Sequence, residues 1–221
     1  MDTYPLAALP PRDVEWSPIA QTRGGGQSLS GLAQLTRLDG GGFWMCRYIQ
    51  VPTPTPSAIE AHAALEARLD GGAAPIIVPR PITPKRMEDA TFSDGATFAD
   101  RSDFTAPSCI VTAAEAAALR ATTLRVTVSA GELGAYFTIE HPTMGPRYYA
   151  IGRRALVSGT TYDLTIRTPL REAVSAGEAL DFDTPRCVMR LADPESMKLK
   201  LDFNRWGFFS PLFVEHLFPL T

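Results

Sequence analysis

The chain has 221 residues, 45% of them hydrophobic and 20% charged, and a net charge of −3. This composition supports a packed core and excludes a wholly disordered chain. A mildly acidic chain is also unlike proteins that grip nucleic-acid phosphates, which need clustered positive charge. No run of 18 apolar residues occurs, so we expect no membrane insertion. Met1–Pro11 lacks the basic start and apolar run of a signal peptide, and we expect assembly in a reducing cytoplasm.

The residue types that usually carry chemistry show no catalytic spacing. Cys46, Cys109 and Cys187 are far apart and odd in number, unlike a disulfide framework or a zinc site. The segment Gly26–Ser30 has serine where a nucleophile elbow needs its second glycine. The glycine triplets are not followed by the Gly-Lys-Ser/Thr of a phosphate cradle. We therefore expect no catalytic residues, no metal and no cofactor, and predict that the protein is not an enzyme.

The first residues are rich in proline, which removes amide donors and favours extended backbone. Four prolines lie within Met1–Arg23 and no steady hydrophobic period is present. The pattern predicts an N-terminal arm over residues 1–23, anchored by Trp16.

Two strands are predicted next, over Gln27–Leu38 and Phe43–Val51, with a glycine turn between them. They could form a hairpin. Residues 43–51 are apolar on both faces, which favours a strand buried on two sides.

One helix is clearly indicated. Ser57 and Glu60 form a capping-box pattern, Ala-rich sequence continues to Leu69, and Gly71-Gly72 follows. A short strand over Ile76–Val78 comes next. A second capping-box pattern at Thr112 predicts a short helix to about Ala121. Between them, residues 80–107 are polar and without a core period, which predicts a protruding loop.

Alternating hydrophobicity then predicts four strands, near residues 124–128, 136–139, 148–157 and 162–166. Turn residues separate them at roughly ten-residue spacing, so we expect an antiparallel meander with one buried face. A helical turn at 169–174 and a strand at Cys187–Ala192 follow. Arg153, Arg154, Arg167 and Arg171 are basic positions that either face water or meet acidic edges of neighbouring subunits; we favour water.

The last segment, residues 206–221, is dense in aromatic residues but too short and too charged to cross a bilayer. Aromatic side chains dominate the centres of interfaces, so we predict subunit contacts by Trp206, Phe208, Phe209 and Phe213, together with Trp16. A core strand of the same chain would explain the pattern equally well.

The predicted fold is mainly β: an antiparallel barrel or sandwich with one main helix, one or two short helices, long loops and extended terminal arms. We expect one mainly β domain over residues 24–205, between the arm and the aromatic C-terminal segment 206–221.

In its order of features the chain resembles the distal tail proteins of long-tailed bacteriophages and related prophage tail proteins. The resemblance spans most of residues 27–192 and rests on these segments in sequence order: Gln27–Gln34, the aromatic strand around Trp44, Ser57–Leu69, Pro75–Pro79, Tyr148–Ile151, Tyr162–Ile166, Thr168–Val174, Gly177 and Cys187–Ala192. Thr168 stands where such proteins commonly have the first of two prolines.

The resemblance implies a homohexameric ring at the tail tip of a virion. Such a ring would join the tail tube protein to hub and fibre or receptor-binding proteins. Genomic DNA would pass through its lumen without specific binding. Two alternatives remain: another tail or neck ring or hub component, and a carbohydrate-binding β-sandwich that uses Tyr136, Tyr148 and Tyr149 as an aromatic platform.

Overall fold

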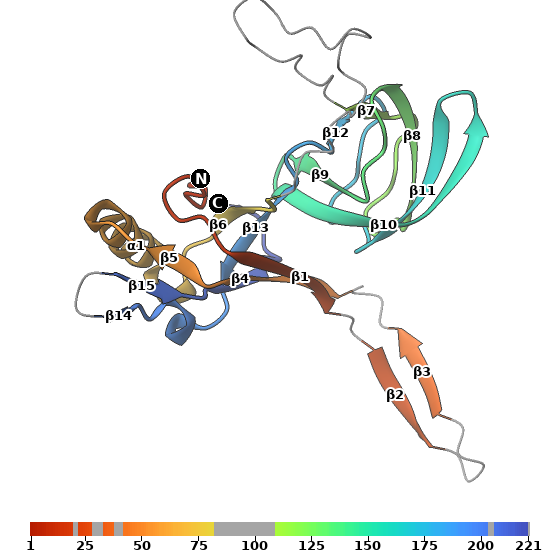
Figure 1. The fold of residues 1–221 in the computed structure, drawn as a ribbon. Coiled ribbons are helices and arrows are strands. Elements are labelled where there is room, and N and C mark those ends of the chain that lie inside the picture. The colour runs from red at the N-terminus through yellow and green to blue at the C-terminus, as the bar shows by residue number, and fades with distance from the viewer. Residues whose placement is uncertain (20–21, 28–32, 38–41, 82–108, 203–205, 221) are drawn as a thin grey trace, which may run out of the picture.

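A computed structural model describes residues 1–19, 22–27, 33–37, 42–81, 109–202 and 206–220. The protein is mainly β, with antiparallel sheets, a closed barrel and one main helix, which confirms the predicted fold class (Figure 1). The strands are β1 Asp13–Ile19, β2 Thr22–Gln27, β3 Ala33–Arg37, β4 Phe43–Ile49, β5 Val51–Thr53, β6 Ile76–Pro79, β7 Ile110–Ala113, β8 Thr123–Ala130, β9 Tyr136–His141, β10 Gly145–Ser158, β11 Thr161–Arg167, β12 Ala179–Asp181, β13 Arg186–Leu191, β14 Lys200–Asp202, β15 Trp206–Phe209 and β16 Leu212–Glu215. The helices are α1 Pro56–Leu69 and the short 3₁₀ turns η1 Asp70–Gly72 and η2 Pro194–Met197.

A five-stranded sheet at the centre has the order β1-β4-β16-β13-β6. It combines strands from both ends of the chain, because β16 inserts between β4 and β13. The N-terminal segment covers the β6 edge, where the Tyr4 amide donates to the Ile77 carbonyl at 2.9 Å. Tyr4 is buried in the core, and β1 pairs along its whole length with β4. The expected N-terminal arm is therefore wrong: residues 1–19 belong to the body of the protein.

Six strands close into a barrel in the order β10-β11-β8-β7-β12-β9. The four predicted strands are present as β8 to β11, and β9, β10 and β11 pair in succession as the predicted meander requires. The expected pairing of β8 with β9 is wrong: β8 pairs with β11 and β7, and β9 pairs with β12 on its other side. The short strands β7 and β12 close the barrel, and closure leaves it without the two free edges of an open meander.

A small sheet, β14-β15-β5, lies beside α1 (Figure 1). The helix begins one residue earlier than predicted, because Thr55 and not Ser57 is its N-cap: the Thr55 hydroxyl accepts from the Ala58 amide at 3.3 Å. Proline at the first helical position suits this start. The helix ends at Leu69, as predicted, with Asp70 in a left-handed conformation. Ala58, His62, Leu65 and Leu69 form its buried side.

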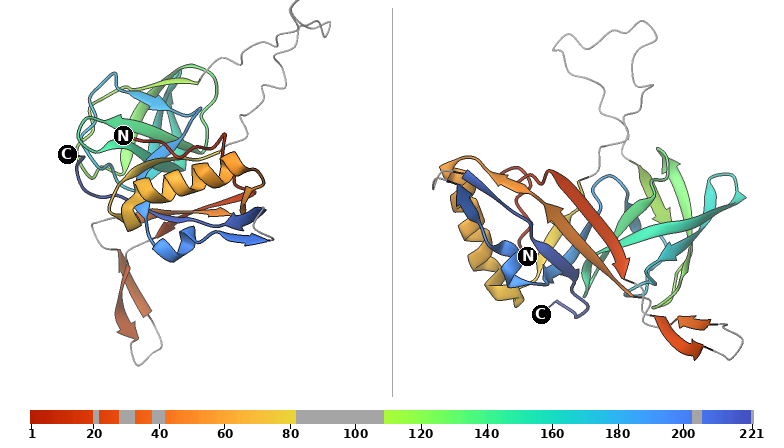
Figure 2. Two further views of the ribbon diagram at one scale, coloured as in Figure 1. Left: turned by 90° about the vertical axis from the view of Figure 1, so that its left-hand side faces the viewer. Right: turned by 60° about the horizontal axis from the view of Figure 1, so that its bottom comes forward.

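Three other local predictions are corrected. The hairpin near the N-terminus is β2–β3, which projects from the body, whereas β4 pairs with β1 and β16 (Figure 2). No helix forms from Thr112, since Thr112 and Ala113 pair with β8 and β12 in the barrel. Residues 169–174 contain no helical turn. In each case pairing between distant strands outweighs a weak local preference.

The described residues form two hydrophobic cores. One lies between the central sheet, α1 and β15, and the other fills the barrel formed by residues 110–181. The barrel is thus inserted into a body made of both chain ends, and the expected division into residues 24–205 and 206–221 does not follow the sheets. The predicted loop at 80–107 lies, beyond Arg80 and Pro81, outside the described residues.

Candidate interaction surface

The two faces of the central sheet are buried to different extents. Residues that stand opposite one another in antiparallel strands share a face. The inner face carries Trp44, Cys46 and Tyr48 of β4 and Phe213 and Glu215 of β16, all buried. The other face, which we call the outer face, carries the residues between them.

The outer face is apolar at its centre and charged at its β1 edge. Its apolar side chains are half-buried, and in the described part of the chain none of them packs against either hydrophobic core. They are Ile19, Phe43, Met45, Ile49, Leu212 and Val214. Asp13, Glu15 and Arg47 are exposed on the same face, and so is Arg190 of β13, which stands opposite Val214. Contiguous apolar surface with a charged rim is typical of an interaction site.

A second candidate surface is the hairpin of β10 and β11, which extends beyond the barrel (Figure 1). We call Gly152–Ser158 with Thr161–Asp163 the ribbon. All seven residues Gly152–Ser158 are exposed. Leu156 and Val157 expose 63% and 46% of their surface, which is unusual for large apolar residues.

Two of the predicted aromatic anchors lie inside the protein. Phe209 is 3% exposed and packs on His62 of α1, with ring centroids 4.4 Å apart. Phe213 is fully buried between Tyr4 and Tyr48. Neither side chain can reach another subunit while the core is intact, so their assignment to an interface is corrected: they form core strands of their own chain.

The other three predicted residues have mixed positions. Trp16 lies on the inner face of β1 and contacts Trp44 and Tyr148, with its ring centroid 4.5 Å from that of Tyr148. Trp206 is 43% exposed, and Phe208 is half-buried beneath the Arg12 guanidinium, 4.7 Å from the ring centroid. Of the five, only these last two remain open to a partner.

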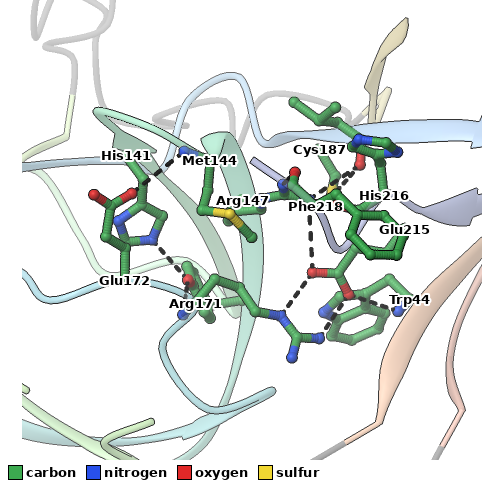
Figure 3. A network of polar contacts seen from close by, with 12 residues as sticks. Trp44, His141, Met144, Arg147, Arg171, Glu172, Cys187, Glu215, His216 and Phe218 are labelled. Atoms are coloured by element: carbon green, nitrogen blue, oxygen red, sulfur yellow. Dashed lines mark hydrogen bonds and ion pairs between the residues drawn. The ribbon is translucent and has the colours of Figure 1, made fainter. Parts of the chain in front are cut away.

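A buried ion pair joins the barrel to the sheet. The Arg171 guanidinium donates to both carboxylate oxygens of Glu215 at 2.8 Å and to the Gly42 carbonyl at 2.7 Å (Figure 3). Glu215 also accepts from the Trp44 amide at 3.0 Å. Burial lowers the pKa of Arg171, but the hydrogen bond and charge of Glu215 outweigh it and raise the pKa overall. Arg171 was expected to face water; it is instead a structural link.

Arg147 fixes the C-terminal segment to the start of β10. Its side chain is fully buried, lies 4.0 Å from Glu215, and donates to the carbonyls of Val188, His216 and Phe218. Glycine suits position 145 in the same corner, because its φ of +67° lies in the left-handed region that other residues rarely adopt. The barrel and sheet are thus joined by charge, hydrogen bonds and close packing.

His141 lies in the same junction. Its Nε2 is 2.8 Å from the Tyr149 hydroxyl, which also accepts from the Arg171 amide at 3.0 Å. The pKa of His141 is lowered to about 4, mainly by burial; Glu172 opposes the shift and Arg147 adds to it. Burial also lowers the pKa of His216.

Acid is therefore expected to destabilise the fold at mild pH. In the unfolded chain His141 binds a proton as pH falls through about 6.5, whereas in the folded protein it does so only near 4. The neutral, buried His141 therefore leaves the free energy of unfolding undiminished above pH 6.5. Between pH 6.5 and pH 4 this free energy falls by about 3 kcal/mol. Urea unfolding of the wild type and His141→Gln across this range measures the effect. An equally steep loss in the variant would contradict it.

The residues proposed for a carbohydrate platform are not available. Tyr148 and Tyr149 are fully buried, one in each core. Tyr136 stacks on Tyr148 and lies under the Arg80 guanidinium, 3.8 Å from the ring centroid. These tyrosines stabilise the junction, and the platform hypothesis loses its three candidates.

In the described ranges no three His, Cys, Asp or Glu residues come together as a metal site. No helix described here is long and apolar enough to span a bilayer. The buried polar and charged groups described above form contacts between strands, so their role is structural. Neither the outer face nor the ribbon could be predicted from the sequence. Alternation shows that a strand has two apolar faces, but it does not show which of them the chain itself covers.

No model of a known protein family matches the sequence, and no curated protein matches it either.

Proposed function

We propose that the protein is a structural virion protein of a bacteriophage tail, a distal tail protein that forms a homohexameric ring at the tail tip. It would connect the tail tube protein to hub and fibre or receptor-binding proteins, with DNA passing through the lumen. The order of sequence features suggests the class. The observation that supports self-association is the outer face, an apolar sheet surface that packs against neither core of its own chain.

The fold suits a protein that acts by shape. The closed barrel and the edges covered within the chain reduce uncontrolled strand pairing. Arg147, Arg171 and Glu215 link the barrel to the sheet, which favours a constant arrangement of the surfaces on the two parts. A fixed relation between two different surfaces is what a closed ring of identical subunits requires.

Placing charge on the outer face tests this function. Met45→Glu with Val214→Glu adds two carboxylates at its centre and is expected to convert rings into monomers in negative-stain electron microscopy. Both side chains are half-buried, so the monomer should stay folded, with a cooperative melting transition.

Leu119→Glu is the matched control, because Leu119 is 56% exposed on the barrel and lies away from the outer face. Rings that persist in the Met45/Val214 variant would contradict the use of this face. A wild-type protein without rings would contradict the proposed function itself.

A further inference from the structure

The ribbon has one open strand edge, and an intact sheet lies behind it. β9 pairs with β10 only as far as Ala150, and the last bond on that side joins the Ile151 amide to the Ala135 carbonyl at 2.9 Å. From Gly152 onward, only β11 pairs with β10 among the described strands. β11 in turn pairs with β8, so the edge borders a sheet of three strands and needs no partner to keep its shape. Such an edge can accept a further strand through its backbone amides and carbonyls.

The part of this edge that can guide a partner is short and regular. β10 has register shifts on either side of residues 153–156, which pair without interruption with residues 162–165. All the side chains at 153–156 are exposed. Bulges bend and twist a strand, so only the regular stretch presents evenly spaced backbone groups. We therefore expect an added strand to be read over this stretch.

The side chains of this stretch differ between the two faces of the sheet. Residues that stand opposite one another share a face. Leu156 stands opposite Tyr162, which packs against the barrel core, so Leu156 lies on the inside of the barrel although 63% of its surface is exposed. Arg153 stands opposite the exposed Thr165 and lies on the outside of the barrel. A strand added at the edge alternates its own side chains in the same way, so it meets both Leu156 and Arg153.

The arginines of the edge have no acidic partner. In the described part of the chain no carboxylate forms an ion pair with Arg153 or Arg154. Arg154 donates to the Gly134 carbonyl at 2.6 Å, which leaves Arg153 as the charge that an added strand would meet on the outside of the barrel.

The surrounding charges do not cancel this positive edge. Asp163 and Glu115 are both paired with Arg125, at 2.7 Å and 2.8 Å. The second half of β10, β8, β11 and the loops on either side of β8 carry five arginines against three acids: Arg120, Arg125, Arg153, Arg154 and Arg167 against Glu115, Glu132 and Asp163. Like charges discourage the edges of two copies from pairing with each other, whereas a positive edge attracts an acidic strand.

We propose that the open edge of β10 binds an extended segment of a partner protein by strand addition, and that it selects a segment in which an apolar residue is followed three positions later by an acid. In an antiparallel added strand the apolar side chain would lie beside Leu156 and the carboxylate beside Arg153. Backbone hydrogen bonds would supply affinity, and these two side chains would supply specificity. The inference goes beyond the proposed ring and does not depend on it; in a tail tip the added strand would belong to a hub or fibre protein.

Selection from a random peptide library tests the proposal. The purified full chain serves as bait for ten-residue peptides displayed on yeast. The wild type is expected to enrich peptides with an apolar residue and an acid three positions later at least tenfold over the starting library. With Arg153→Glu as bait, a basic residue should replace the acid at the same position. Arg68→Glu, on the exposed side of α1, is the matched control and should keep the wild-type preference.

Backbone methylation distinguishes strand addition from simple charge attraction. In the tightest selected peptide, N-methyl groups at alternate residues are expected to abolish binding, because only every second amide of a strand points toward one neighbour. N-methyl groups at the residues between them should have a much smaller effect. Hydrogen exchange should become slower within residues 152–158 when the peptide binds. Leu156→Ser should weaken the preference for the apolar residue, and thermal melting checks that each variant is folded.

Three outcomes would overturn strand addition: no enriched peptide, a preference that Arg153→Glu leaves unchanged, or methylation that weakens binding equally at every residue. Slow exchange of residues 152–158 in the wild type without peptide would show that a second copy occupies the edge, which also overturns it. The mass of the assembled protein is a separate measurement. A wild type that forms no ring would overturn the proposed function and leave a peptide selected at this edge unaffected.

Discussion

Replacing Glu215 with alanine is expected to lower the free energy of unfolding by about 3–5 kcal/mol, because the change removes the counter-charge of two buried guanidinium groups. Arg171 would lose both bonds to the carboxylate, and the fully buried Arg147 would lose its nearest anion. The Trp44 amide would lose its acceptor too. Urea unfolding at a fixed protein concentration measures the change, since assembly adds to apparent stability.

Two control variants test whether the loss comes from the buried charge. Glu195→Ala removes an exposed ion pair with Lys198 and should change stability by less than about 1 kcal/mol. Glu215→Gln keeps an acceptor for the Trp44 amide but loses the charge, so its loss should be substantial but smaller than that of alanine. An alanine variant at position 215 that unfolds like the wild type would show that the pair does not join barrel and sheet.

Replacing Phe213 with alanine is expected to cost about 3–5 kcal/mol as well, through a cavity in the larger core. The Phe213 ring is fully buried and makes edge contacts with Tyr4 and Tyr48, with centroid distances of 6.0 Å and 5.9 Å. These contacts join β16 to the N-terminal segment and β4, so the loss should appear in global unfolding by urea or heat.

Phe208→Ala is the matched control for this change, because Phe208 belongs to the same aromatic segment but is half-buried under Arg12. Its substitution should cost about 1 kcal/mol or less. If Phe213→Ala instead kept full stability and only prevented assembly, the original assignment of Phe213 to a subunit interface would be restored.

Much of the fold could be predicted from local patterns. Turn residues and alternation located β8 to β11, and a capping pattern located α1 to within one residue at its start. These features depend on residues close together in the chain. The placement of β16 between β4 and β13 could not be predicted, because the sequence near residues 212–215 does not determine which strands they pair with.

The residues of the candidate interaction surface could not be predicted for the same reason. The density of aromatic residues from residue 206 onward indicated a segment with buried aromatic side chains, and Phe209 and Phe213 are buried. Whether an aromatic residue faces a neighbour or the core depends on a one-residue alternation within strands only four residues long. Similarly, Arg171 and Glu215 are 44 residues apart, and only the completed fold brings them together.

The exposure of the second half of β10 results from a length mismatch between strands. β10 has 14 residues, whereas β9 has six, so the second half of β10 extends past its neighbour. Sequence alternation predicted a long strand near residues 148–157 but not that one of its edges would be bare. Edge exposure is a property of pairing, and it becomes visible only when the barrel is complete.

We propose that this protein acts by associating with copies of itself through an apolar sheet face that its own chain leaves open. Native mass spectrometry of the purified full chain tests it most directly. We predict a discrete species with the mass of six 24.0 kDa chains, with no populated series of open oligomers. A monomer that persists at the highest soluble concentration would contradict the claim.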